Sequence, residues 1–583
     1  MNIVSTGGNV LGTGQLIDSL GICIGATICT NGTGTVSIQH GITSPFNLNA
    51  FLVGGATTNG TFGTINVGGL VIGAIAIPNP AGSLVQGNLT VTPGGIPSTT
   101  PIATVPVIEF SGIKERRSEV PRDRSRPTVD TSDVDRDRAG RALEVGDYGG
   151  AFDAIESAYI SAYENYLGET LTFQVKNIEQ LQQELDDVSK LSGSVTTAVY
   201  PIIMGDRLEL LIIPPKGMSK PFREFVADAK QSAIMPVIMD FANNIRDTGS
   251  DDYMEQSQQL YNWLVRPYRD RLQALQEQYQ KSDLRTGQVN QNPNHIQANA
   301  KQTTPKTDPQ VQLPPTLIFV MDGGLRVIPV AALHDGKRFL IEEYALANLP
   351  YLRATRLEKR DRNLNNVLAM GLTESVQGFS ALPGVKIEVS TISSQALKGN
   401  SYFDQEFTVD NLQEKRRQGN YGVLHLATHA QFISDDSKGA FIQFWNERLF
   451  IDRIPKLRFD SPLIEMLTLS ACQTAVGQNL GLGGLAVSSG AKSVLASLWE
   501  VSDTGTAPLM IQFYNSFPEN ITKAIALQRS QIGMISGGVT IKDGKIIGIP
   551  NVLPIPLAKG TESNISIQHP YFWSSFILIG NWL

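Results

Sequence analysis

Short apolar runs alternate with amphipathic stretches from Thr316 to the carboxyl end of the chain. The apolar runs have the length and composition of β-strands and lie at 316–321, 339–346, 367–371, 422–428, 464–470, 493–498 and 572–579. Helical stretches intervene at 385–397, 409–417, 485–489, 504–517 and 521–534. This alternation is typical of a mostly parallel sheet with helices on both faces, so we predict a doubly wound α/β domain over 314–583. Ligands of such a domain bind outside the carboxyl ends of its strands.

A helical region with one hairpin precedes this domain, over 147–280. Apolar residues recur on one face in 152–163 and again in 178–188, which predicts two helices. Two strand-like runs at 197–200 and 208–213 flank Gly205-Asp206 and predict a hairpin. Two further helices are expected at 221–245 and 252–279. The segment 281–313 is rich in Gln, Asn, Pro and Thr, and we predict a mobile loop there.

The amino-terminal segment, 1–96, is nearly free of charge. Asp18 is the only charged residue before Glu109, and 20 of the 54 glycines lie in this stretch. Short β-prone runs separated by Asn-Gly and Gly-Gly turns favour stacked short strands, as in a β-solenoid, with a disordered tract as the alternative. The run at 46–55 resembles filamentous haemagglutinin, a secreted adhesin. The following segment, 97–146, is first Pro-rich and then dense in mixed charge, so it is predicted to be a solvated linker.

The composition of the chain excludes several classes of function and bears on where the protein is located. The net charge of −7 argues against a general nucleic-acid or anionic-membrane binder. No apolar run reaches the roughly 18 residues of a transmembrane helix, and three cysteines make no disulfide framework. The start of the chain lacks the basic and apolar regions of a signal peptide. This absence and the presence of a free thiol favour a location in the cytoplasm. An adhesin-like segment would instead belong outside the cell.

Two predicted strands end in residues that can carry chemistry. His429 follows the apolar run at 422–428, and Cys472 follows the run at 464–470. Because neighbouring parallel strands lie about 5 Å apart, groups just beyond their ends can approach one another. A nearby imidazole stabilises a thiolate and can protonate a leaving amine, so the pair is a candidate for nucleophilic catalysis.

Two other residues near these strand ends have alternative explanations. His425 lies inside the apolar run, where a histidine is usually structural. Asp503 follows the strand at 493–498 and is a candidate acid in a substrate pocket for a basic side chain. The alternative for Asp503 is a helix N-cap before Thr504.

Around these residues the sequence resembles the CHAT domain, a caspase-like module related to separase, in the clan of caspases, gingipains and legumains. The most specific matches are 425–429 (HLATH), 469–474 (LSACQT) and 490–503 (GAKSVLASLWEVSD). Supporting matches are 260–267, 321–329, 382–384 and 570–580, and all occur in the family's order between about Ile178 and Leu583. The proteins it resembles are bacterial, of a cyanobacterial type.

The resemblance implies a caspase-like α/β/α sandwich and a cysteine endopeptidase with His429 as general base and Cys472 as nucleophile. The backbone N–H groups of Ala430 and Cys472 would form the oxyanion hole; Ala430 stands where caspase-like enzymes often have Gly, but it still supplies an N–H. No metal or organic cofactor is implied, and the expected partners are a protein or peptide substrate and a regulatory protein. Two other functions stay open: a non-catalytic signalling or scaffold module with this fold, and a fragment of a secreted adhesin.

Overall fold

The chain forms two compact units in a computed structural model, Met1–Arg126 and Pro127–Leu583. In the first unit the structure describes nine short strands between Asn2 and Gly94. In the second it describes residues 131–583 except 168–175, 283–312, 353–356, 358–361, 432–439, 472–483, 485, 488, 501–502, 518–520 and 558–563. The predicted mobile loop at 281–313 therefore lies almost wholly outside the described residues.

The amino-terminal unit is built from short strands where the sequence has its β-prone runs. They are β1 (Asn2–Val4), β2 (Ala26–Thr30), β3 (Val36–Gly41), β4 (Asn49–Val53), β5 (Thr64–Val67), β6 (Leu70–Ile72), β7 (Ile75–Pro78), β8 (Leu84–Gln86) and β9 (Leu89–Gly94). β3 pairs in parallel with both β1 and β9, and β2 pairs in parallel with β5. The other pairs, β4–β7, β5–β6 and β8–β9, are antiparallel.

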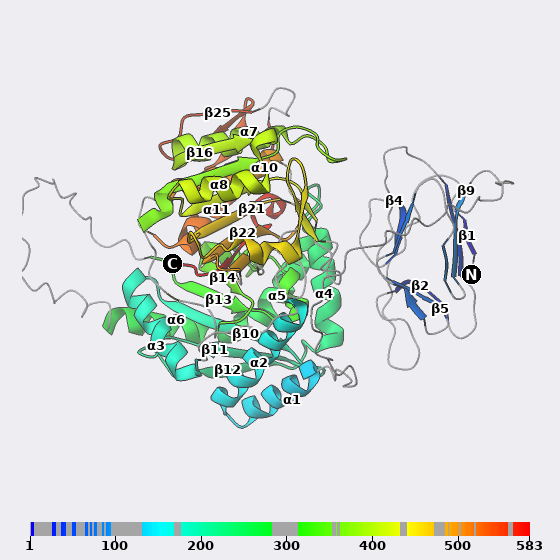
Figure 1. Ribbon diagram of the computed structural model, residues 1–583. Helices are drawn as coiled ribbons and strands as arrows, with labels where there is room; N and C mark the ends of the chain where they lie inside the picture. Colours follow the sequence, from blue (N-terminus) through cyan, green and yellow to red (C-terminus); the bar gives the residue numbers. More distant parts are fainter. Residues whose placement is uncertain are drawn as a thin grey trace, which may run out of the picture. The chain divides into compact units, whose positions relative to one another are not determined.

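One large sheet forms the centre of the second unit (Figure 1). Among the described residues it has eleven strands in the order β12-β11-β10-β13-β14-β26-β22-β21-β17-β15-β16. Their bounds in that order are Phe222–Val226, Leu208–Ile213, Thr196–Ile203, Thr316–Val320, Ala345–Leu349, Phe576–Gly580, Ser493–Ser497, Met466–Ser470, Val423–Ala427, Asn366–Gly371 and Lys398–Phe403. The hairpin of β10 and β11, from the amino-terminal half of the second unit, thus belongs to the same sheet as the strands of its carboxyl-terminal half.

Parallel pairing dominates the carboxyl-terminal half of this sheet. β16, β15, β17, β21 and β22 run parallel, so their carboxyl ends meet at one edge. The last strand, β26, is antiparallel to β22 and pairs in parallel with β14. It therefore joins the two halves of the sheet, and the prediction of a mostly parallel sheet is confirmed.

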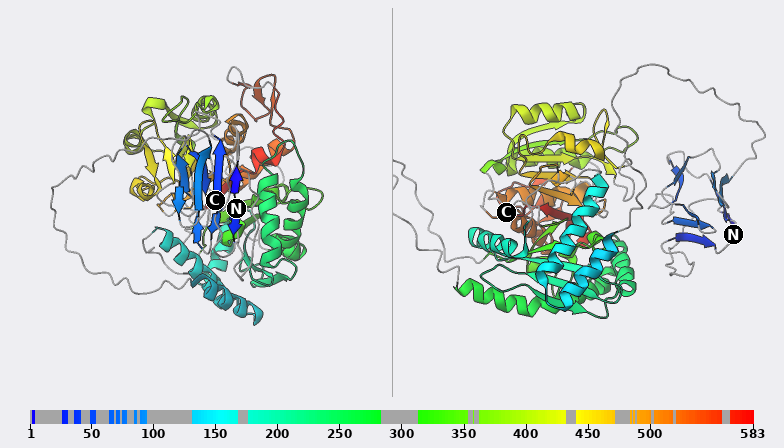
Figure 2. Two further views of the ribbon diagram at one scale, coloured as in Figure 1. Left: turned by 90° about the vertical axis from the view of Figure 1, so that its right-hand side faces the viewer. Right: turned by 60° about the horizontal axis from the view of Figure 1, so that its bottom comes forward.

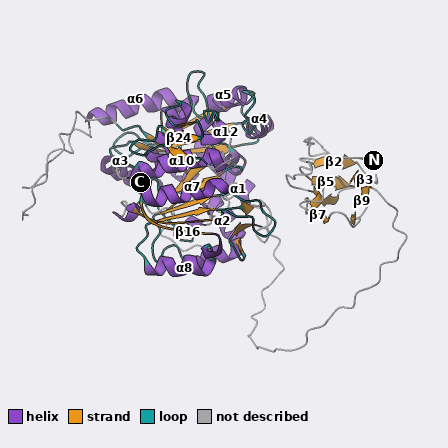
Figure 3. Cartoon of the chain, turned by 90° about the horizontal axis from the view of Figure 1, so that it is seen from above, coloured by secondary structure: helices purple, strands orange, loops and turns teal. Residues whose placement is uncertain are grey.

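Helices cover both faces of this sheet. The chain passes from β15 through α7 (Pro383–Thr391) to β16, and back through α8 (Val409–Gln418) to β17. Because such crossovers are right-handed and these two run in opposite directions, α7 and α8 lie on opposite faces. Figure 3 shows this arrangement, with α10 (Asp503–Asn515) beside α7. α11 (Lys523–Ile535) packs against α10, and the short α12 (Pro570–Trp573) precedes β26.

The other helices belong to the amino-terminal half of the unit, and one of them corrects the predicted linker. They are α1 (Thr131–Glu144), α2 (Tyr148–Leu167), α3 (Ile178–Ser192), α4 (Gln231–Asn244), α5 (Tyr253–Leu264) and α6 (Arg266–Ser282). The carboxyl-terminal part of the mixed-charge segment assigned to the linker 97–146 lies in α1, which buries Ala139 and Leu143. Arg136 of this helix pairs with Asp322 at 2.7 Å. One of the charges that suggested a solvated tether, that of Arg136, is thus paired within the folded unit.

The helix α2 packs on the hairpin end of the sheet, where the right view of Figure 2 shows it in cyan. The ring of Phe152 meets that of Tyr200 edge to face at 6.0 Å. The hydroxyl of Tyr200 donates a hydrogen bond to buried Glu156 at 2.8 Å. The predicted helix at 152–163 and the predicted hairpin are both present.

Two predicted helices differ from the structure. The first, at 221–245, begins as the edge strand β12, because Phe222 to Val226 pairs antiparallel with β11, and becomes helical only in α4. The second, at 252–279, is divided between α5 and α6 at Val265. Pro267 has no N–H to continue a helical ladder, which explains the break.

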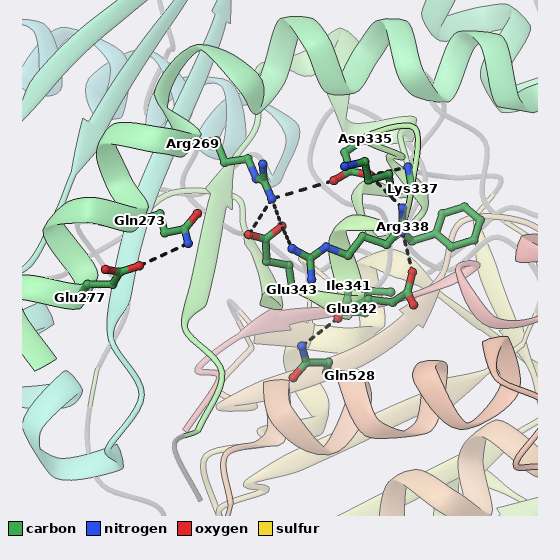
Figure 4. A network of polar contacts seen from close by, with 11 residues as sticks. Arg269, Gln273, Glu277, Asp335, Lys337, Arg338, Ile341, Glu342, Glu343 and Gln528 are labelled. Atoms are coloured by element: carbon green, nitrogen blue, oxygen red, sulfur yellow. Dashed lines mark hydrogen bonds and ion pairs between the residues drawn. The ribbon is translucent and has the colours of Figure 1, made fainter.

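Polar contacts join the helix α6 to the core of the unit, as Figure 4 shows. Arg269 of α6 donates to both carboxylate oxygens of Glu343, at 3.1 and 2.9 Å. On the other side of the same segment, Gln528 of α11 donates to the carbonyl of Ile341 at 2.8 Å. The strand predicted at 339–346 begins only at Ala345, because Leu340–Glu342 forms a 3-10 turn.

Two small antiparallel sheets complete the described part of the unit. One consists of β18 (Ala430–Gln431), β19 (Phe441–Gln443) and β20 (Arg448–Phe450). The other consists of β23 (Thr540–Lys542), β24 (Lys545–Ile547) and β25 (Ile555–Pro556). The first of these follows His429 directly and so borders the candidate site.

Candidate functional site

A pocket opens at the carboxyl edge of the parallel strands. Its walls come from the carboxyl ends of β17, β21 and β22, from α7 and the residue before it, from the first turn of α10 and from the start of β26. The lining residues are Leu382, Val385, Glu388, Thr428, His429, Ser470, Ala471, Ser497, Trp499, Glu500, Thr506 and Phe576. The pocket therefore lies where ligands of a doubly wound sheet are expected.

Hydrogen bonds hold the ends of the strands β17, β21 and β22 together. The backbone N–H of Thr428 donates to the carbonyl of Ser470 at 3.1 Å. The hydroxyl of Ser497 donates to the carbonyl of Ala471 at 2.5 Å. The structure thus brings the residue before His429 beside the strand end that leads to Cys472.

The imidazole of His429 is half-buried and held on two sides. Its Nε2 lies 2.8 Å from the carbonyl oxygen of Ser380. Its ring stacks on that of Phe379 at a centroid distance of 4.7 Å and an angle of 22°. Because a carbonyl oxygen can only accept, Nε2 carries the proton of the neutral ring and Nδ1 keeps its lone pair. His429 can therefore take up a proton at Nδ1.

Burial lowers the pKa of His429 from its ordinary value of 6.5, while the Ser380 carbonyl and the charge of Glu500 act in the opposite direction. This shift favours the neutral ring, the form that a base requires. We expect its pKa, measured by NMR on ¹³C-histidine-labelled protein, to lie below 6.5. Glu500→Gln should lower it further because a negative charge is removed, whereas Glu179→Gln, an exposed acid in α3, should leave it unchanged. A pKa at or above 6.5 would contradict the prediction.

The backbone N–H of Ala430 donates no hydrogen bond to the neighbouring strand β19. Gln443 donates its N–H to the carbonyl of His429 at 2.9 Å. In the antiparallel ladder of β18 and β19, Ala430 and Ile442 then form a non-hydrogen-bonded pair. The Ala430 N–H is thereby directed away from β19, as an oxyanion donor requires.

The side chains of two predicted site residues lie outside the described part of the chain. Cys472 lies outside the described residues, two positions beyond the end of β21. Asp503 is the first residue of α10, and its side chain also lies outside the described residues. Their roles remain predictions.

His425 has the buried position expected of a structural histidine. Its side chain is fully buried, with Nδ1 3.2 Å from the hydroxyl of Tyr514. Its Nε2 lies 3.0 Å from Oε1 of Glu388, out of hydrogen-bond alignment. Tyr514 in turn donates to Thr468 at 2.5 Å.

We expect His425→Ala to lower the free energy of unfolding by about 1–3 kcal/mol, because it leaves buried polar groups without a partner. His429→Ala should cost less, since His429 is half-buried and makes one hydrogen bond to the backbone. Urea unfolding of the two variants tests this order. An equal or larger loss at His429 would contradict it.

The residues of this site that sequence reasoning missed include Phe379, Ser380, Glu388 and Ser470. Ser380 acts through its carbonyl, which has no sequence signal. Glu388 lies in a predicted helix, where an acidic residue is ordinarily exposed, yet its side chain is only 2% exposed. No local pattern distinguishes such an acid from one that faces solvent.

Within the described ranges, no group of three or more His, Cys, Asp or Glu side chains is placed to hold a metal ion. In the same part of the chain, no helix combines the length and the apolar character needed to span a membrane.

Comparison with known proteins identifies one family. The family model described as "CHAT domain" matches residues 254–581, more than half of the chain. The match does not reach the amino-terminal segment, and the resemblance of that segment to filamentous haemagglutinin has no support from these comparisons. No curated protein matches the chain in sequence.

Two similar solved structures are both of the Saccharomyces cerevisiae separase–securin complex. One has a TM-score of 0.42 and 10% sequence identity, and the match covers 75% of this chain and 34% of that chain. The other has a TM-score of 0.37 and 10% identity, and covers 78% of this chain and 34% of that one. The chain thus spans about a third of the length of these structures.

Proposed function

The chain belongs to the CHAT domain family, and on this premise we propose that it is a caspase-like cysteine endopeptidase. The observation that carries the proposal is the position of His429 at the carboxyl end of β17. There it lines a pocket, its Nε2 is engaged by the Ser380 carbonyl, and it lies beside the strand end that leads to Cys472. A base with a lone pair on Nδ1 next to a nucleophile is the arrangement that thiol catalysis needs.

In the proposed reaction, His429 takes the thiol proton of Cys472 at Nδ1, and the thiolate attacks the carbonyl carbon of the substrate. The backbone N–H groups of Ala430 and Cys472 stabilise the resulting oxyanion. The C–N bond then breaks, and the imidazolium returns its proton to the leaving amine. Water, deprotonated by His429, attacks the thioester, and cleavage of the C–S bond releases the acid and regenerates the thiol.

The substrate in this proposal is a protein or peptide chain whose side chain enters the pocket. Apolar walls from Leu382, Trp499 and Phe576 adjoin an acidic residue, Glu500. Asp503 is proposed as a further acid there because α10 begins beside the pocket. Such walls suit a long side chain with a basic end.

A peptide-based alkylating probe tests the proposal. Mass spectrometric mapping should find Cys472 labelled and Cys23 and Cys29 spared, and His429→Ala should slow the labelling of Cys472. Equal labelling of all three cysteines, independent of His429, would indicate a non-catalytic module with this fold.

We also propose that a regulatory protein partner completes the cleft. If the binding-competent state is a minor population of the isolated chain, the apparent substrate affinity falls by that fraction. Labelling of Cys472 should then be slow in the purified chain and faster in lysate of the source organism. Full and rapid labelling of the purified chain would show that no partner is needed.

A further inference from the structure

A chain of buried polar contacts lies beneath the pocket and joins four elements. Tyr514 of α10 contacts His425 of β17, and His425 lies against Glu388 of α7. The hydroxyl of Ser470, the last residue of β21, donates to Oε1 of Glu388 at 2.8 Å. Each of these elements also borders or leads to the candidate site.

The carboxylate of Glu388 is the central member of this chain of contacts. Its side chain is 2% exposed, and a charge so buried is costly unless polar groups compensate it. Oε1 has two such neighbours, the Ser470 hydroxyl and the His425 ring. Both come from neighbouring parallel strands, so the carboxylate bridges β17 and β21 at the floor of the pocket.

Ser470 is two residues before Cys472, at the point where the chain leaves the sheet. Its carbonyl is held by the N–H of Thr428, and the carbonyl of Ala471 is held by Ser497. The contact with Glu388 is the one that holds the side chain of Ser470. Together these bonds hold Ser470 and Ala471, the residues that directly precede Cys472.

We propose that Glu388 is a positioning residue for the nucleophile, acting through Ser470 rather than on the substrate. This inference rests on the proposed function. A small displacement of a nucleophile from its attacking geometry costs about 10²-fold in rate, so a bond at the base of its loop has a large influence.

The experiment compares variants in a Cys23→Ser, Cys29→Ser background, in which Cys472 is the sole thiol. Glu388→Gln is nearly isosteric but carries no charge, and Ser470→Ala removes the donor with little change in volume. The matched control is Glu465→Gln. Glu465 is also buried and paired, with Lys492 at 2.7 Å, but it lies next to the opposite, amino end of β21.

We expect Glu388→Gln and Ser470→Ala each to lower kcat by about tenfold or more, with KM changed less than about twofold. The rate of alkylation of Cys472 by iodoacetamide should fall in parallel. The double variant should be little worse than either single variant, because both remove the same contact. Glu465→Gln should leave kcat and alkylation unchanged at temperatures where it is folded.

Unchanged kcat and alkylation in Glu388→Gln and Ser470→Ala, or equal changes in Glu465→Gln, would overturn the positioning role. If Glu388→Gln does not fold, Ser470→Ala decides the question alone. If the unmodified chain cleaves no peptide but its alkylation still depends on Glu388 and Ser470, the proposed function fails and the positioning role stands.

Discussion

Replacing Cys472 by alanine is expected to lower peptide cleavage by roughly 10³-fold or more, because the proposed nucleophile is removed. His429→Ala should cost nearly as much, and the double variant should be no worse than either single one, since members of a catalytic unit do not act additively. The measurement is kcat/KM on a peptide substrate that the unmodified chain cleaves.

The controls for this prediction are the other two cysteines. A Cys23→Ala, Cys29→Ala variant should keep full activity, and the Cys472→Ala protein should unfold at the same temperature as the unmodified chain. Residual activity above a few per cent in Cys472→Ala would identify a different nucleophile.

Replacing Leu578 by aspartate is expected to prevent the second unit from folding. Leu578 is 1% exposed at the centre of β26, where it pairs with Leu495 of β22. Because β26 joins the two halves of the sheet, an unpaired charge there disrupts both. A loss of more than about 4 kcal/mol is the expected size for such a change.

Leu553→Asp is the matched control, since Leu553 is 79% exposed. It should change the free energy of unfolding by less than about 0.5 kcal/mol. Circular dichroism and the yield of soluble protein distinguish the two variants. A folded, cooperatively melting Leu578→Asp protein would show that β26 is not essential to the sheet.

The sequence alone determined the class of the fold and one residue that lines the pocket, His429, whereas Cys472 stays a prediction. Strands buried on both faces read as continuous apolar runs, and β13 (TLIFV) and β17 (VLHLA) are of this kind. His429 and Cys472 were both predicted because each follows such a run. The resemblance to the CHAT domain, carried by the same residues, agrees with the family match over 254–581.

Predictions from local sequence patterns were wrong where the structure of a segment depends on a partner far away in the chain. The charges of α1 suggested a tether, but Arg136 pairs with Asp322 and Glu144 with Arg207. The edge strand β12 has charged residues in its middle and forms by pairing with β11. Neither partner can be read from the segment itself.

Only the tertiary structure decided the surroundings of His429 and the burial of Glu388. The acceptor for His429 is a backbone carbonyl, which every residue has, so no sequence pattern marks Ser380. Glu388 is buried because His425 and Ser470, 37 and 82 positions away in the chain, meet it at the floor of the pocket. A periodic pattern reports which residues share a face, whereas the pairing of polar groups across elements depends on how those faces pack.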